Sequence, residues 1–235
     1  MESEGKLKYR IIFWDNWVLN KLPQQEPAGP LYNIDGPKGS IRRLHFPHCE
    51  TGKGKAKLAV AHMADGNMEI IQSQKVTDTH VIINIQSLSQ FGLISPWSKT
   101  SIRAQVLLFY KKFTEHSKSK LHVHLLPAHV PVKEVQKHYK SYSYIDTTPS
   151  CELTPRKRYR LHCTSTDMVY ILQPELVEFH RDCGPNYHPT FEMLLKIEVA
   201  EFTLNLSDKK GKEVWKRSVD LLTGTEPDSH SLDLE

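Results

Sequence analysis

Short segments in which apolar and polar residues alternate make up most of this chain. Alternation with a period of two residues is typical of β-strands that have one buried face. These segments are rich in β-branched and aromatic residues, and turn-forming stretches such as A-D-G-N, D-C-G-P-N and S-D-K-K-G-K separate them. The predicted strands are residues 57–63, 80–86, 103–110, 121–126, 158–163, 176–180 and 200–206.

Only residues 130–139 have helical spacing, because Val132, Val135 and Tyr139 can share one face there. Many short strands at short intervals favour β-sandwiches over a parallel α/β sheet. A proline and polar residues at 95–100, S-P-W-S-K-T, mark a boundary between two groups of strands. We therefore predict an all-β fold of two consecutive antiparallel β-sandwich subdomains, with at most one short helix.

Length and charge narrow the possible partners. A chain of 235 residues is long enough for one large β domain or two ordinary ones. Its 31 Lys and Arg are interspersed with 27 Asp and Glu, and nucleic-acid binding usually shows a concentrated basic stripe. No apolar stretch approaches the ~20 residues of a membrane span, and the N-terminus lacks the apolar region of a signal peptide. We expect a cytoplasmic protein that binds neither nucleic acid nor membrane.

The cysteines do not form a metal or disulfide pattern. They are widely spaced, without a C-x-x-C pair, at Cys49, Cys151, Cys163 and Cys183. Free thiols in a reducing cytosol are the simpler interpretation. The sequence H-F-P-H-C brings together His45, His48 and Cys49, but zinc needs a fourth ligand on a rigid frame and none is marked. There is no Gly-rich phosphate loop, so we expect neither metal nor cofactor.

Several longer stretches are informative through their order and spacing along the chain, although no single one is specific. They are A-G-P-L-Y-N-I, I-R-R-L-H-F-P-H, V-A-H-M, L-H-V-H-L-L-P, I-L-Q-P-E-L-V-E-F and S-D-K-K-G-K-E-V-W. In this order the chain resembles the function-to-find domain (FIIND) of NACHT-leucine-rich-repeat and CARD-bearing inflammasome sensors. That domain consists of a ZU-five-type half followed by a UPA half.

The resemblance implies the domain organisation. Residues 1–97 would be a ZU-five-type β-sandwich, truncated at its N-terminus by a strand or two, and residues 98–225 a UPA β-sandwich. Residues 226–235 lack the apolar content to pack, so we expect a disordered tail. No CARD of about 90 residues fits within these bounds. The chain is then either part of a longer polypeptide or a regulator that pairs through its UPA surfaces.

The family cleaves itself at a Phe-Ser bond inside S-F-S-P-x-G. The similar segment here is S-L-S-Q-F-G, residues 87–92, and it places Ser89 on the nucleophile and the cut at Leu88–Ser89. The separation of His62 from His80 equals that of the family positions, which places His62 on the assisting histidine. A second register aligns Phe91 with the family phenylalanine, which would put a glycine in place of the serine and leave the site inactive. Gly92 matches the family glycine only in the first register.

Three positions depart from the family pattern. Leu88 replaces the phenylalanine, and Gln90 replaces a proline whose fixed φ would help to strain the turn. The glutamate that orients the histidine is expected nine residues after His62, where Ile71 stands. Glu69 precedes it by two residues, on the same face of a strand, and either substitutes for the missing carboxylate or points into solvent.

The resemblance implies a regulatory module of innate immune signalling. It would cut itself into two noncovalently associated fragments, with inflammasome components, other UPA halves and dipeptidyl peptidases as protein partners. Gln90 would be second in the new N-terminus, which disfavours the peptidases, since they prefer proline or alanine there. Activity would be at most a single-turnover autoproteolysis.

A catalytically silent β-sandwich that binds partners through its UPA half is the alternative function. A serine after a strand is ordinarily a turn residue that satisfies a backbone group. Nothing in the sequence supports an enzyme acting on other molecules. We expect His80 to be structural, and His122 and His124 to be partly exposed polar positions on one strand face.

Overall fold

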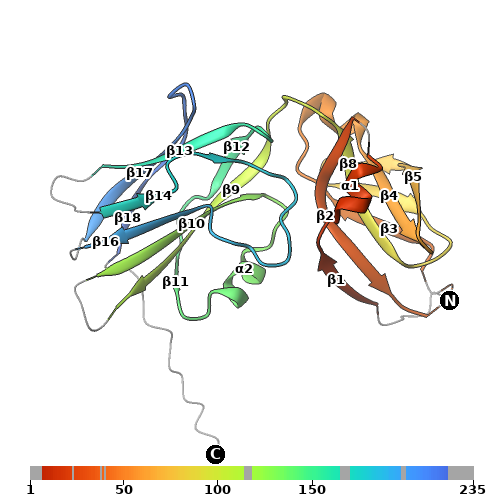
Figure 1. The fold of residues 1–235 in the computed structure, drawn as a ribbon, viewed down its shortest axis with the longest axis horizontal. Helices are drawn as coiled ribbons and strands as arrows, with labels where there is room; N and C mark the ends of the chain where they lie inside the picture. The colour runs from red at the N-terminus through yellow and green to blue at the C-terminus, as the bar shows by residue number, and fades with distance from the viewer. Residues whose placement is uncertain are drawn as a thin grey trace, which may run out of the picture.

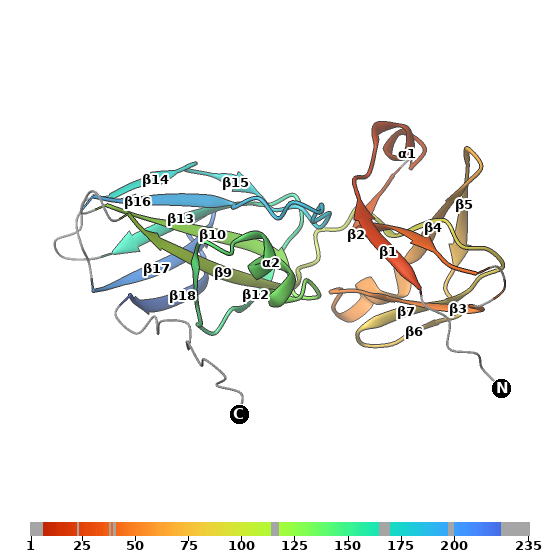
Figure 2. The same cartoon turned by 90° about the horizontal axis from the view of Figure 1, so that it is seen from below.

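Two β-sandwiches lie side by side and are joined by one chain segment (Figures 1 and 2). The structure, a computed structural model, describes residues 7–22, 24–37, 39, 41–113, 118–164, 170–196 and 200–221. We call the strands up to residue 96 the first half and those from residue 102 the second half. The predicted all-β class is confirmed, since antiparallel sheets make up both halves. The tail predicted at 226–235 lies outside the described residues.

The first half consists of a five-stranded and a three-stranded sheet. The larger sheet has the order β1 (Lys8–Ile12), β2 (Gln25–Asp35), β8 (Gln90–Pro96), β4 (Ala59–Ala64) and β5 (Asn67–Gln72). The smaller one has the order β3 (Arg43–Pro47), β7 (His80–Asn84) and β6 (Lys75–Val76). Phe91 and Leu93 of β8 pack against Phe46 and Ile83 of the smaller sheet, so β8 is central in both sheet order and core.

The second half is a larger sandwich with its own core. One sheet has the order β11 (Ser143–Ile145), β9 (Ile102–Lys112), β10 (Ser119–Pro127), β16 (Phe191–Leu195) and β14 (Tyr170–Gln173), and β12 (Ser150–Leu153) also pairs with β9. The other has the order β15 (Val177–Glu178), β13 (Arg158–Thr164), β17 (Glu201–Asp208) and β18 (Glu213–Asp220). Buried side chains of both sheets meet in one cluster.

The predicted helix near residues 130–139 is α2 (Val132–His138), and Val135 is its buried residue. Two further short helices occur in the described residues, α1 (Asn16–Asn20) and the 3-10 helix η1 (Gly52–Lys57). Helix α1 is a single capped turn, because the Asp15 carboxylate accepts a hydrogen bond from the Val18 amide at 2.8 Å. Such a turn is too short to show a helical period in the sequence.

Strand β8 is held closely on its second face by Trp14, which precedes α1. A Cβ atom on Gly92 would lie 2.3 Å from Trp14 Cζ2, so only glycine fits beneath this ring. The Trp14 indole is fixed in turn, because its Nε1 donates to the Gly29 carbonyl at 3.0 Å. Gly92 therefore serves close packing of the strand, and the segment that begins at Ser89 enters a tightly held strand.

Candidate functional site

Three side chains lie in a row across three neighbouring strands of the first half. His62 of β4 is directly opposite Glu69 of β5 and directly opposite Phe91 of β8. Directly opposite residues in antiparallel strands have Cβ atoms about 4.5–5.5 Å apart, so their side chains meet on one face. Ser89 immediately precedes β8 and is two residues from Phe91, which puts its side chain on the same face.

These residues form a continuous serine–histidine–carboxylate chain of contacts. His62 Nδ1 lies 2.7 Å from Glu69 Oε1, and His62 Nε2 lies 2.8 Å from Ser89 Oγ. The imidazole is stacked on the Phe91 ring, with centroids 4.2 Å apart and planes 4° apart. With its proton on Nδ1, the ring donates to the carboxylate and presents the Nε2 lone pair to the hydroxyl. This is the arrangement in which histidine takes a proton from a serine nucleophile.

A backbone carbonyl also holds the serine hydroxyl. Ser89 Oγ donates to the Met63 carbonyl oxygen at 2.7 Å. A hydroxyl carries one hydrogen, so it donates either to Met63 or to His62 Nε2 at a given moment. The carbonyl therefore fixes the position of Oγ, and a rotation about the Cβ–Oγ bond turns the hydroxyl hydrogen from the Met63 carbonyl toward His62 Nε2.

Both flanks of the Leu88–Ser89 bond are anchored. The Leu88 side chain packs against the core between the two sheets of the first half. The Ser89 carbonyl accepts a hydrogen bond from the Ile34 amide of β2 at 2.7 Å. Anchoring both residues removes much of the conformational freedom that an intramolecular attack would otherwise have to restrict.

The turn between β4 and β5 decides which residue of β5 lies opposite His62. Asp65 and Gly66 both have positive φ, 51° and 74°, as a two-residue hairpin turn requires. This turn pairs Ala64 with Asn67 and therefore His62 with Glu69. The alternative position, Ile71, lies opposite Val60 and packs on the core. The D-G pair in the sequence is the signal that fixes this register.

Family models match the two halves consecutively. A model described as "Function to find" matches residues 1–101, and one described as "UPA-FIIND domain" matches residues 102–219. The chain belongs to the function-to-find (FIIND) family. A search of curated proteins finds no match. The UPA-FIIND match begins at the first residue of β9, and domains of these two kinds are protein-interaction modules. Among the described residues of this FIIND chain, no helix has the length and apolar character to cross a membrane.

The histidines and cysteine of H-F-P-H-C do not converge in the FIIND fold. His48 Nε2 lies 3.1 Å from the Thr77 carbonyl, and Cys49 Sγ lies 3.0 Å from His129 Nδ1. Burial raises the pKa of the Cys49 thiol to about 11, so the thiol stays protonated. Within the part of the chain that the structure describes, no group of three or more His, Cys, Asp or Glu is placed to hold a metal ion.

The expectation that His122 and His124 are partly exposed is wrong. They are 8% and 0% exposed, because Tyr139 and Tyr142, which follow α2, cover this face of β10. Burial is the main cause that lowers the pKa of His124, to about 3, so its ring is neutral. His80 lies in β7, in the smaller sheet of the FIIND half, and hydrogen bonds with the Thr79 hydroxyl at 2.9 Å.

Proposed function

We propose that this chain is a FIIND regulatory module that cleaves its own backbone between Leu88 and Ser89. The observation that carries the proposal is the placement of Ser89 Oγ 2.8 Å from His62 Nε2, with Glu69 2.7 Å from the other ring nitrogen. The hydroxyl belongs to the residue that follows the bond to be cut, so its target carbonyl is the preceding one. We expect one turnover per chain.

The chemistry has two steps, and each conserves its protons. His62 Nε2 takes the hydroxyl proton while Oγ attacks the Leu88 carbonyl carbon; the C–N bond then breaks, and the imidazolium returns the proton to the Ser89 nitrogen. The product is an ester between Leu88 and Ser89 Oγ. Water then attacks the ester, giving a Leu88 carboxylate and a free Ser89 with amine and hydroxyl. Glu69 holds the neutral ring in the tautomer with its proton on Nδ1 and stabilises the imidazolium that forms.

The arrangement of β8 supports the expectation that the fragments remain together. β8 begins at Gln90 and lies between β2 and β4, both of which precede the cut. Its residues from Phe91 to Ser95 are buried. After cleavage the strand would keep its hydrogen bonds on both sides and its apolar contacts, so separating the fragments would require pulling a central strand out of a sheet.

Family membership supports the biological setting that we propose. The module acts in inflammasome signalling in the cytoplasm, through protein partners and association of its UPA half with others. A free C-terminal fragment would begin with Ser89 and Gln90. This is a poor match for dipeptidyl peptidases, which prefer proline or alanine as the second residue.

A silent interaction domain is the second candidate. Two observations favour it: the Ser89 hydroxyl already has an acceptor in the Met63 carbonyl, and the Glu69 side chain is 65% exposed. Water competes for an exposed carboxylate and weakens its hold on the imidazole. In this case Ser89 only satisfies the backbone, and the chain binds partners without being cut.

Intact-mass measurement of the purified chain distinguishes the two candidates. The wild type is expected to give one fragment that ends at Leu88 and one that begins at Ser89, and Ser89→Ala is expected to stay whole. Ser87→Ala is the matched control, because this serine lies exposed in the same segment. A wild type that remains whole after long incubation, like Ser89→Ala, contradicts self-cleavage and leaves the interaction domain.

A further inference from the structure

A buried ion-pair cluster connects the two halves at some distance from Ser89. Arg181, in the segment between β15 and β16, contacts the Glu50 carboxylate through Nη1 and the Glu26 carboxylate through Nη2. The side chains of Arg181 and Glu50 are 3% and 4% exposed, and that of Glu26 is 14% exposed. Arg156, which is half exposed, approaches Glu26 at 4.0 Å. Two carboxylates and two guanidinium groups therefore balance in charge.

The members of this cluster lie on opposite sides of the proposed cut. Glu26 belongs to β2 and Glu50 follows β3, both before Leu88, whereas Arg181 belongs to the second half. We propose that Arg181, Glu26 and Glu50 form a lock that keeps the second half docked on the first, so that release of residues 89–235 requires this lock to open as well as β8 to leave its sheet. The part that concerns release rests on the proposed cleavage, whereas the docking of the two halves does not.

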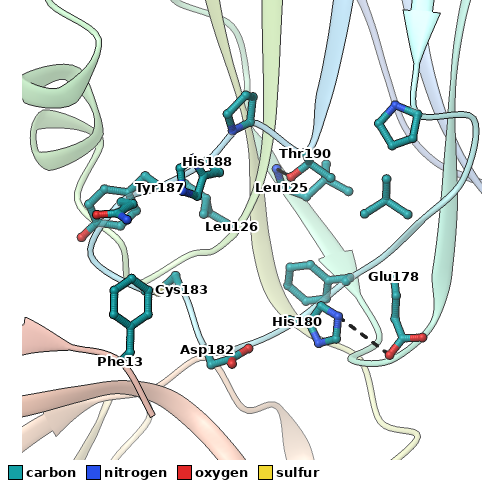
Figure 3. A pocket seen from close by; sticks show the side chains of 16 residues that line it. Phe13, Leu125, Leu126, Glu178, His180, Asp182, Cys183, Tyr187, His188 and Thr190 are labelled. Atoms are coloured by element: carbon teal, nitrogen blue, oxygen red, sulfur yellow. Dashed lines mark hydrogen bonds and ion pairs between the residues drawn. The ribbon is translucent and has the colours of Figure 1, made fainter. Parts of the chain in front are cut away.

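The segment that carries Arg181 meets the first half through the buried Arg181 and through contacts nearer the surface. Its neighbours His180 and Asp182 are exposed and line a pocket of about 460 Å³, with Phe13 of the first half on its other wall (Figure 3). Phe13 covers Gly184, where a Cβ atom would lie 2.8 Å from the ring. Arg181 thus gives this segment a charged contact with the first half, and Phe13 gives it an apolar one.

The other connections between the halves near Glu50 are neutral or backbone-mediated. The Arg103 amide donates to the Cys49 carbonyl at 2.9 Å, and Arg103 Nη2 donates to the carbonyls of His48 and Asp78 at 3.0 and 2.9 Å. The bond from the Arg103 amide contributes little net stability because water replaces it on opening, and the bonds from the Arg103 guanidinium, although stronger, end on neutral carbonyls that water can also solvate. Removing one member of a buried ion pair is more damaging, since an uncompensated charge is left in the interior. This difference leads us to expect that loss of Arg181 weakens docking more than loss of any one of these hydrogen bonds.

Gly54 of η1 makes the position of Glu50 possible. A Cβ atom on Gly54 would lie 2.6 Å from Glu50 Oε2, so a side chain there displaces the carboxylate. Gly54→Ala therefore disturbs the lock without removing any charge. It provides a second variant that separates loss of the contact from loss of a cation.

Hydrogen exchange in an uncut chain tests the docking by itself. In a Ser89→Ala background, Arg181→Met is expected to speed exchange of the Arg103 amide at least tenfold, because this amide bonds across the two halves. Arg160→Met is the matched control, since Arg160 pairs with Glu175 on the surface within the second half. Unchanged exchange in β10 shows that the second half has stayed folded. If Arg181→Met does not fold, the same exchange measurement on Gly54→Ala tests the docking, and faster exchange of the Arg103 amide is again expected.

Retention of the fragments in a cut chain tests the consequence. With residues 1–88 immobilised, Arg181→Met is expected to release residues 89–235 at least tenfold faster than the wild type, and Arg160→Met at the wild-type rate. Unchanged exchange at Arg103 in both lock variants overturns the lock, whether or not the wild type cuts itself. Faster exchange without faster release overturns its role in retention. A wild type that is never cut, with faster exchange in the variants, refutes cleavage and leaves the lock standing.

Discussion

The two halves of the molecule each pair a histidine with a glutamate across antiparallel strands. In the first half His62 lies opposite Glu69, and in the second His122 lies opposite Glu192. Both histidines are 8% exposed, and each has one ring nitrogen within hydrogen-bonding distance of its glutamate, at 2.7 and 3.2 Å. Apart from the greater exposure of the Glu69 side chain, 65% against 30% for Glu192, the two pairs are nearly equivalent.

The second ring nitrogen separates them. His62 Nε2 meets the Ser89 hydroxyl, whereas His122 Nδ1 is buried and has no hydrogen-bond partner among the described residues. Lys120 Nζ also forms an ion pair with Glu192 Oε2 at 2.9 Å, so His122 is not the sole partner of this carboxylate. Burial is the main cause that lowers the pKa of His122, which keeps that ring neutral. A histidine–carboxylate pair is therefore ordinary sheet structure, and it becomes a candidate site only where a hydroxyl reaches the other nitrogen.

Replacing the carboxylate is expected to have the largest effect on this comparison. Glu69→Gln keeps an acceptor for Nδ1 but loses the charge that stabilises the imidazolium. Loss of a buried carboxylate from such a triad slows catalysis by about 10⁴, and for the exposed Glu69 we expect roughly 10². The rate is read from the fraction of cut chain against time after cell-free synthesis.

Glu192→Gln makes the same change beside the other histidine and serves as the control. Its cleavage rate is expected to stay within about twofold of the wild type, since Glu192 has no contact with Ser89. Equal slowing in both variants would mean that the substitutions act through general stability, and the special role of Glu69 would be lost.

The stability of the second half is expected to depend on pH through its buried histidine His124. Burial lowers the pKa of His124 from 6.5 to about 3 in the folded protein. A histidine with a lowered folded pKa contributes stability above its unfolded pKa, and this stability is lost as the pH falls below it. Between pH 7.5 and pH 5 this one group is expected to lower the free energy of unfolding by about 2 kcal/mol, or roughly 30-fold in the folding equilibrium.

His124→Phe isolates that contribution, because Phe109 and Tyr139 already surround the ring with aromatic contacts. Urea unfolding at both pH values is expected to show a smaller loss in the variant by this amount. Equal losses in the wild type and the variant would mean that other groups account for the acid sensitivity.

The alternating pattern of the sequence identified the fold class and placed strands close to the observed β4, β7, β9, β10, β13, β15 and β17. It also marked the helix α2 through Val132 and Val135. It missed β8, whose short apolar run Gln90–Pro96 carries no alternation, and it also missed strands whose burial does alternate, such as β3, β16 and β18. The predicted strand at 176–180 shrinks to Val177–Glu178, since the segment after it turns toward the interface with Arg181.

The candidate site combined two kinds of information. The positions of Ser89 and His62 came from resemblance to the family, and whether Glu69 could stand in for the glutamate missing at Ile71 was open until the hairpin register placed it opposite His62. The burial of His124 was missed because two histidines alternating on one strand look like a solvated face. Tyr139 and Tyr142 bury these histidines through tertiary contacts, which the local sequence pattern does not predict.

The smallest effect is expected from the ring on which His62 rests. Phe91→Leu leaves an apolar side chain in the same buried place but removes the flat surface that keeps the imidazole parallel, 4.2 Å away. The ring then samples orientations in which Nε2 no longer faces Ser89 Oγ, and we expect cleavage to slow roughly 10-fold. The same time course after synthesis measures it.

Phe46→Leu is the matched control. Phe46 belongs to the same core, with its ring centroid 6.1 Å from that of Phe91, but the imidazole of His62 stacks on Phe91. Both substitutions are expected to lower the free energy of unfolding by about 1 kcal/mol, as loss of core volume does. Only Phe91→Leu is expected to slow cleavage. If the two variants slow cleavage equally, core packing alone sets the rate. If neither slows it, Glu69 and the backbone suffice to orient His62. The stacked ring then has no catalytic role, and it is as ordinary a contact as the stacking of His122 on Tyr142 in the second half.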